Sequence, residues 1–322
     1  MKKTFLTSAA LLLSLLAHSQ EADDLGSRYA EVTLVARAEY SSVQDDHLGN
    51  SSFYALLDGA FSSNLSYSVA THLLSSCPGD LYSGTLYSNT TNWLDWAYLT
   101  YDFGQFQFEL GKDCIALGTF EFMENDFDCY YELQSPFWSM LPCYQWGAML
   151  YWTPSDVFEL TASMNTSPYG EKPFASGLYS YNLRGAVTTD VYEGLYGAGM
   201  HQVDKGDYIG LLTMGHRFNL GDNWQVTWDS YCSLADFNAY STMLSLCYSP
   251  SDAWRFIGLS GFDNYDLDAE DLFAITDGGN WHAGLLANWY PIESLRVHAL
   301  AAYDSFSESP LFNLGLTWQI TL

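Results

Sequence analysis

One pattern limits the fold of this chain more than any other: apolar and polar residues alternate in segments of about ten residues that recur along the sequence. A period of two is the pattern of a β-strand with one apolar face. The clearest segments are EVTLVARAEY (31–40), FQFELGKD (106–113), CYQWGAMLYW (143–152), LYSYNLRGAV (178–187), NWQVTWDSY (223–231), WHAGLLANWY (281–290), LRVHALAAY (295–303) and NLGLTWQITL (313–322). Less regular alternation covers 53–61, 65–74, 93–103, 157–164, 195–203, 208–218, 239–248 and 253–262. Together these segments predict sixteen strands.

The segment at 313–322 indicates how the strands are arranged. Leu314, Leu316, Trp318, Ile320 and Leu322 are apolar at every second position, and no residue between them is charged. A strand at the free edge of a sheet is usually protected by charge or proline. We therefore expect this strand to pair with the segment at 31–40, so that the sheet closes without an edge.

Composition is consistent with such a barrel in a membrane. Aromatic residues make up 17% of the chain and charged residues only 15%, whereas a typical soluble domain is about a quarter charged. No apolar stretch after the N-terminal segment is long enough for a membrane-spanning helix. Strands cross a bilayer only as a closed barrel, because every backbone polar group must be satisfied within the protein. The predicted fold class is all-β, a closed antiparallel transmembrane β-barrel of sixteen strands.

Residues 1–19 have the features of a secretory signal peptide. Lys2 and Lys3 precede an apolar run from Ala9 to Ala17, and small residues follow it. The pattern predicts cleavage near Ser19, which leaves residues 20–322 as one barrel domain outside the cytoplasm. The apolar run is too short for a membrane anchor.

The links between the predicted strands alternate in length. Short links at 62–64, 104–105, 153–156, 219–222, 249–252 and 293–294 alternate with mostly longer ones. Bacterial outer-membrane barrels have an even number of strands, short periplasmic turns and long external loops. We therefore expect both termini in the periplasm. Two links on the loop side, 204–207 and 235–238, are short, and the turn at 189–194 is expected to be long.

The link between the fifth and sixth predicted strands carries the segments GKDCIALGTFEF (111–122) and FWSMLPCYQWG (137–147). With these segments and the apolar closing strand, the chain resembles outer-membrane porins and, more loosely, the phosphate-selective porin O and P family. The resemblance implies a sixteen-stranded channel in the cell outer membrane whose third loop folds inward and narrows the pore. It also implies a homotrimer.

Acidic residues dominate the predicted loops. The formal net charge is −27, and we expect an acidic external mouth to concentrate cations. A competing interpretation is that these are solvated loops whose charges bind divalent ions that bridge to lipopolysaccharide. The carboxylates of the third loop are Glu121, Glu124, Asp126, Asp128 and Glu132, and others lie at Asp45, Asp46, Asp263, Asp266, Asp268, Glu270, Asp271 and Asp277.

Five arginines fall inside predicted strands, on the face opposite the apolar set: Arg37, Arg184, Arg217, Arg255 and Arg296. A charged side chain on the lipid face would cost ~2–4 kcal/mol near the midplane, so we expect these residues to face the lumen. Together with the third-loop carboxylates they would set a transverse field across the constriction. Arg37 and Arg184 are the stronger candidates for the channel interior, because the other three lie near short turns and fit a periplasmic rim equally well.

The expected solutes are small hydrophilic molecules or ions, with a weak preference for cations. Phosphate selectivity needs many lysine and arginine donors, yet only Lys112, Lys172 and Lys205 follow the leader. An anion- or phosphate-selective porin is the second interpretation.

Aromatic residues near the short turns predict a girdle at the membrane interface: Phe103, Phe106, Trp152, Phe218, Trp224, Trp228, Trp254 and Trp289. Tyr130, Tyr131, Phe137 and Trp138 in the third loop are expected to pack against the barrel wall rather than to stack on sugars.

Cysteine and histidine positions offer few signs of other chemistry. Cys114 and Cys143 flank the third loop, and export permits a disulfide between them, but six cysteines allow fifteen connectivities. Histidines are scattered without a nucleophile motif, so we expect no enzyme, no cofactor, no metal site and no nucleic-acid partner. A surface receptor or adhesin, with calcium at DNYDLDAED (263–271), and an outer-membrane hydrolase are the alternatives from other classes.

Overall fold

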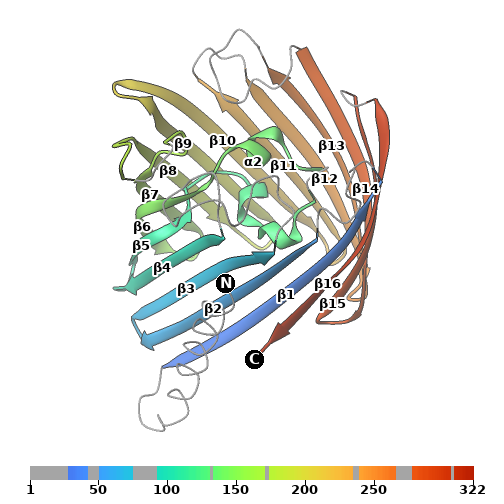
Figure 1. Ribbon diagram of the computed structural model, residues 1–322, viewed down its shortest axis with the longest axis horizontal. Coiled ribbons are helices and arrows are strands. Elements are labelled where there is room, and N and C mark those ends of the chain that lie inside the picture. The colour runs from blue at the N-terminus through green and yellow to red at the C-terminus, as the bar shows by residue number, and fades with distance from the viewer. Residues whose placement is uncertain are drawn as a thin grey trace.

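The computed structural model describes residues 28–42, 51–74, 93–130, 133–170, 174–234, 239–265, 278–305 and 308–322. This part of the chain forms sixteen strands in one closed antiparallel barrel (Figure 1). The strands are β1 (Tyr29–Ser41), β2 (Ser52–Ser62), β3 (Leu65–Leu74), β4 (Leu94–Asp102), β5 (Phe106–Cys114), β6 (Tyr144–Ser155), β7 (Phe158–Thr166), β8 (Tyr179–Thr188), β9 (Tyr192–Asp204), β10 (Asp207–Leu220), β11 (Trp224–Ser233), β12 (Tyr240–Ser251), β13 (Trp254–Tyr265), β14 (Gly278–Ile292), β15 (Leu295–Asp304) and β16 (Ser309–Thr321).

The first and last strands close the barrel. β1 pairs antiparallel with β16, with Thr33 opposite Thr321 and Ala36 opposite Trp318. Every other strand pairs with its neighbours in sequence. The predicted fold class and the absence of a free edge at 313–322 are therefore confirmed. The leader predicted at 1–19 lies outside the described residues.

Alternation along the strands separates an apolar outer face from a polar inner face. In β16 the side chains of Leu314, Leu316 and Trp318 are exposed on the outside, whereas Asn313 and Thr317 are buried on the inside. Apolar exposure on this scale is unfavourable in water. It suits a hydrocarbon environment, in which polar residues are kept on the lumen side.

Tight turns join the strands at one end of the barrel. Residues 63–64, 103–105, 156–157, 221–223, 252–253 and 293–294 form short links, as predicted. The turn expected to be long at 189–194 has only the three residues 189–191, because β9 already begins at Tyr192. On the opposite side, residues 205–206 form a short link, as predicted, whereas 235–238 lie outside the described residues.

An aromatic girdle surrounds the barrel near the tight turns. All eight aromatic residues predicted for it are exposed. Their rings form stacked pairs, with centroids 5.6 Å apart for Phe103 and Phe106 and 6.1 Å apart for Trp254 and Trp289. Amphipathic rings of this kind favour the interface between hydrocarbon and water.

Residues 115–143, which we call the third loop, join β5 to β6, and the described part of them, 115–130 and 133–143, lies inside the barrel. They include two 3₁₀ turns, η1 (Glu121–Met123) and η2 (Asp126–Asp128), and the short helix α2 (Pro136–Met140). Figure 1 shows α2 and its neighbouring turns within the ring of strands. No helix of the described residues is long and apolar enough to cross a membrane. The inward loop expected from the resemblance to porins is present in the structure.

Candidate pore constriction

The start of the third loop is attached to β10 and β11. The Asp229 carboxylate accepts hydrogen bonds from the backbone N–H groups of Phe120 and Glu121, at 3.0 and 3.1 Å. Thr213 Oγ1 accepts from the Gly118 N–H at 2.7 Å. The first N–H groups of a helical turn have no partner within the turn. The two strands supply those partners, so this part of the loop is fixed to the wall.

Two glycines let the loop backbone touch the wall. A Cβ at Gly118 would lie 2.2 Å from the Gly197 nitrogen, and a Cβ at Gly197 would lie 2.6 Å from the Gly118 nitrogen. Any larger residue would push the loop away from β9. This close approach gave no recognisable signal in the sequence.

Glu121 is buried between the loop and the wall rather than exposed in the lumen. Its carboxyl group accepts hydrogen bonds from the Ser135 N–H at 2.5 Å and the Ser135 hydroxyl at 2.6 Å, and Tyr231 Oη lies 2.6 Å away. Burial is the largest influence and raises the pKa of Glu121 to about 8, despite these hydrogen bonds. The expectation that Glu121 adds negative charge to the constriction is therefore wrong: the residue joins two parts of the loop to β11.

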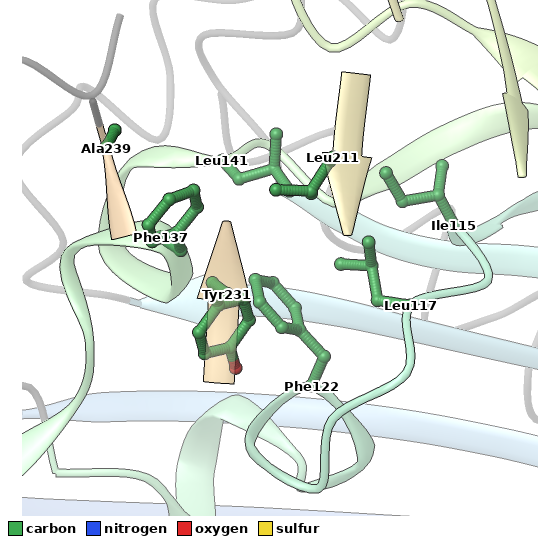
Figure 2. Packing of buried hydrophobic residues seen from close by; sticks show 8 residues of the cluster. All are labelled: Ile115, Leu117, Phe122, Phe137, Leu141, Leu211, Tyr231 and Ala239. Carbon is green, nitrogen blue, oxygen red and sulfur yellow. The ribbon is translucent and has the colours of Figure 1, made fainter. Parts of the chain in front are cut away.

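Apolar packing reinforces this attachment. Figure 2 shows Phe122, Phe137 and Leu141 of the loop beside Tyr231 and Leu211 of the wall. The rings of Phe137 and Tyr231 stack with centroids 5.1 Å apart. Tyr130 and Phe137 are buried, so these two loop aromatics pack against the wall, as predicted.

Arg37 attaches the far end of the loop and does not line the pore. It is only 4% exposed, and its Nη1 donates to the carbonyl oxygens of Cys129 and Phe127, at 2.5 and 3.4 Å. Its Nε donates to Glu39 at 2.6 Å, and Asn313 also donates to that carboxylate. The prediction that Arg37 belongs to the channel interior is corrected: the loop covers it.

Arg296 and Tyr130 complete the attachment at the far end. Arg296 Nη1 lies 2.6 Å from the Asp128 carboxylate, and its Nη2 donates to the Phe127 carbonyl at 3.0 Å. The Tyr130 hydroxyl donates to Asn288 Oδ1 at 3.0 Å. Burial raises the pKa of Tyr130 to about 12, so this hydroxyl keeps its proton. The loop is thus held by β1, β14 and β15 as well as by β10 and β11.

Three arginines line one cavity beside the loop. Arg217, Arg255 and Arg296 border a space of about 490 Å³ together with Glu124 and Asp128 of the loop. The guanidinium of Arg217 lies 3.9 Å above the Phe120 ring, and Arg255 Nε lies 3.1 Å from Cys247 Sγ. For these three arginines a periplasmic rim and the channel interior were equally expected locations. All three lie beside the third loop.

Arg184 borders a second cavity on the other side of the loop. This space of about 340 Å³ is lined by residues that include Tyr98, Asp113 and Tyr151. Arg184 Nη2 lies 3.2 Å from the Glu159 carboxylate, and Nη1 lies 3.3 Å from Met123 Sδ. The structure therefore places Arg184 in the lumen, paired with a wall carboxylate.

The other predicted acidic residues differ in their exposure. Glu124 is exposed and borders both cavities, and Asp126 begins η2. Glu132 lies outside the described residues. Asp263, expected in an external loop, lies in β13, where it is buried and accepts a hydrogen bond from Ser241 at 2.5 Å. Strand β13 ends at Tyr265, beyond its predicted end at residue 262. The hydrogen bond from Ser241 on β12 satisfies the Asp263 carboxylate within this extension.

The two cysteines at the base of the loop are the last residue of β5, Cys114, and the residue before β6, Cys143. Cys114 is opposite Tyr144, the residue after Cys143, and both cysteines pack against the cluster in Figure 2. The Cys114 sulfur donates to the Ile115 carbonyl at 3.6 Å. A disulfide between Cys114 and Cys143 stays a prediction.

Sequence reasoning missed the wall residues that hold the loop. Thr213, Asp229, Tyr231 and Asn288 are inward-facing residues of strands that were correctly located. The available signal was a carboxylate at an inward position of the segment NWQVTWDSY, since a buried carboxylate requires hydrogen-bond donors. Within the described residues, no group of three or more His, Cys, Asp or Glu side chains could hold a metal ion.

Comparison with known proteins shows similarity at the level of structure alone. No family model and no curated protein matches the sequence. A loop-deletion mutant of OmpT, an outer membrane protein of Vibrio cholerae, aligns with a TM-score of 0.65 at 12% identity over 92% of this chain and 100% of its own. OmpT in its trimer form gives 0.61 at 12% identity over 93% and 100%. A triple mutant of Rhodopseudomonas blastica porin gives 0.57 at 10% identity over 91% and 100%. At such identities the likeness is one of fold, and this chain has the closed barrel fold of outer-membrane porins.

Proposed function

We propose that this protein is a channel of the cell outer membrane through which small hydrophilic solutes or ions diffuse passively. The observation that carries the proposal is a polar lumen narrowed by an attached inner loop, inside a closed barrel with an apolar outer face. The same proposal includes export by cleavage near Ser19 and termini in the periplasm. Periplasmic turns of outer-membrane barrels are short, and the start of β1 and the end of β16 lie at the same end of the barrel as the tight turns.

The lumen supports ion selection by a transverse field. Glu124 and Asp128 on the loop face Arg217, Arg255 and Arg296 on the wall. Neither Glu121 nor Arg37 adds to this field, because one is largely protonated at neutral pH and the other is covered. We propose a weak cation preference, which originates mainly in the acidic chain as a whole, with its formal net charge of −27.

An anion- or phosphate-selective channel is the second candidate, favoured by the three arginines around one cavity. The one lysine of β4 to β6, Lys112, is buried, lines neither cavity and donates to the Leu94 carbonyl at 2.5 Å. It therefore supplies no second donor for a phosphate near the arginines. The structural matches give no reason to favour the phosphate-selective family over other porins.

A planar-bilayer recording with a salt gradient tests the proposed function. Stepwise single-channel currents with a reversal potential on the cation side would support it. A protein that folds as a barrel but gives no currents would be a plugged receptor or adhesin, and turnover of a lipid or peptide substrate would identify an outer-membrane hydrolase. Potassium currents blocked by micromolar phosphate would favour the second candidate.

The proposed partners follow from the same location. The outer face would contact outer-membrane lipid, and the acidic loops would bind divalent ions that bridge to lipopolysaccharide. We also propose a homotrimer, which cross-linking of the detergent-solubilised protein would test.

A further inference from the structure

The third loop crosses the lumen and is held at both ends of the crossing. Asp229 on β11 holds the N–H groups of Phe120 and Glu121. Arg37 on β1 holds the carbonyl groups of Phe127 and Cys129. The loop is therefore a bar across the pore rather than a shelf along one wall.

The two cavities beside this bar have separate walls. We call the larger one the arginine chamber, since its wall residues come from β10 to β15 and include Arg217, Arg255 and Arg296. We call the smaller one the tyrosine chamber, since its wall residues come from β4, β5, β6 and β8 and include Tyr98 and Tyr151. The residues common to both are loop residues: Met123, Glu124 and Asn125.

The tyrosine chamber combines aromatic faces with carboxyl groups. Trp96 and Tyr144 have ring centroids 5.9 Å apart at its wall, and Tyr98 and Tyr151 add two phenol rings. The carboxyl groups of Asp113 and Glu109 are neighbours on β5, and the Tyr151 hydroxyl donates to Glu109 at 3.3 Å. A cation beside two neighbouring carboxylates relieves their mutual repulsion.

The one arginine among the lining residues of this chamber, Arg184, is 3.2 Å from the Glu159 carboxylate and also acts electrostatically on Asp113 and Glu109. One guanidinium therefore faces three carboxyl groups. In the arginine chamber the relation is reversed, because Asp128 is paired with Arg296 at 2.6 Å while Arg255 has a thiol, Cys247, as its polar neighbour at 3.1 Å. Among the described lining residues on the strands, the arginine chamber has three arginines and one carboxylate, Asp229, whereas the tyrosine chamber has Asp113 and one arginine, so the arginine chamber has the more basic wall.

We propose that the third loop divides the pore into two passages, and that the tyrosine chamber binds and admits organic cations such as alkylammonium ions. A cation with an apolar surface is attracted to aromatic faces within about 6 Å of the ring, and the carboxyl groups of Asp113 and Glu109 supply the opposite charge. The arginine chamber is the passage for anions. This inference rests on the proposed channel function.

The test compares two variants that remove the same charge from different chambers. Asp113→Asn acts in the tyrosine chamber and Asp128→Asn in the arginine chamber. Tetraethylammonium permeability relative to potassium is measured from bi-ionic reversal potentials. One unit charge about 6 Å from the path of an ion in water changes the local concentration of that ion about threefold. We expect Asp113→Asn to lower the tetraethylammonium ratio about threefold, with a much smaller change for Asp128→Asn, which instead raises chloride permeability.

A second pair of variants reverses the sign. Arg184→Met should raise the tetraethylammonium ratio, whereas Arg255→Met should mainly lower chloride permeability. Heat-modifiable migration in gels confirms that each variant is folded, and single-channel current in the unmodified protein confirms the channel itself. If currents are present but both aspartate variants change both ratios equally, the lumen is one passage and the inference is overturned while the channel function stands. Absence of currents in the unmodified protein overturns both.

Discussion

Glu121 shows how a single buried carboxyl group can couple loop position to pH. Its pKa is raised from an ordinary 4.5 to about 8, first because burial disfavours the charged form and also because Asp229 is close. A raised pKa means that the docked loop binds the proton more tightly than the undocked loop does. Protonation of Glu121 therefore makes its full contribution to the stability of the docked loop below pH about 4.5, and this contribution is lost as the pH rises toward 8 and above.

We expect the loop to loosen when the pH is raised from about 6 to about 9, because Glu121 must then ionise in a buried position. Current fluctuations and mean conductance should both rise over this range. Glu121→Gln keeps the size and most of the hydrogen bonds of the side chain, and should abolish the change. The measurement is single-channel recording at constant salt. A variant that responds to pH as the unmodified protein does would show that another group is responsible.

The buried pair of Arg37 and Glu39 predicts a strongly non-additive effect on stability. Arg37→Met leaves the Glu39 carboxylate buried without its cation, and removal of one partner of such a pair costs about 3–5 kcal/mol. The double variant Arg37→Met with Glu39→Gln should recover part of this loss. Denaturant unfolding in detergent micelles measures the difference.

Arg255→Met is the matched control for that experiment, because it removes an arginine that faces the cavity. Arg255 is half-buried and its Nε donates to a thiol rather than to a buried carboxylate, so its effect on unfolding should be only about 1 kcal/mol. Equal destabilisation by Arg37→Met and Arg255→Met would contradict the assigned role of Arg37.

At the scale of elements, Gly118 and Gly197 set how closely the loop approaches β9. Gly118→Ala would place a Cβ 2.2 Å from the Gly197 nitrogen, which the backbone can relieve only by moving the loop. Overpacking of this kind costs about 1–3 kcal/mol. We expect a larger and noisier conductance, measured in bilayers. Gly185→Ala is the control, because no atom lies within 4 Å of the Cβ that it would add, and it should leave the conductance unchanged.

Elements also show what the sequence allows one to predict. All sixteen strands were located because a two-residue period needs only local information. The start of β9 was missed because Gly194 has no side chain on the outer face and Leu195 is apolar on the inner face, where it is buried. In both positions the alternation that marks a strand is hidden.

The candidate site could be predicted only in part, for a different physical reason. Alternation places an arginine on the inner face, but it carries no information on what lies above that face. Arg37 and Arg217 look alike in sequence, yet the loop covers Arg37 and leaves Arg217 beside a cavity. Similarly, Glu121 and Glu124 are three residues apart, and only the route of the loop decides that one is buried and the other exposed.

At the scale of the whole molecule, we expect a weak cation preference that depends on salt. The preference should decrease as salt rises from about 0.1 M to about 1 M, because the Debye length falls from about 10 Å to about 3 Å. Neutralising Glu124, Asp126 and Asp128 together should shift the reversal potential toward anions. Neutralising Arg217, Arg255 and Arg296 should strengthen the cation preference. Anion selectivity of the unmodified channel would show that the arginines dominate the field.

The contacts of the third loop also determine when during biogenesis the pore can reach its final width. Residues 115–143 are synthesised before the second half of the chain, but their partners at the far end are Arg37 on β1, Asn288 on β14 and Arg296 on β15. The Glu39 carboxylate that orients Arg37 is itself held by Asn313 on β16. The loop therefore lacks part of its attachment to the wall until the last strand has paired with the first. Attachment of the far end of the loop and closure of the wall become one late event in assembly, and in a barrel that is still open the loop is held at its start by β10 and β11.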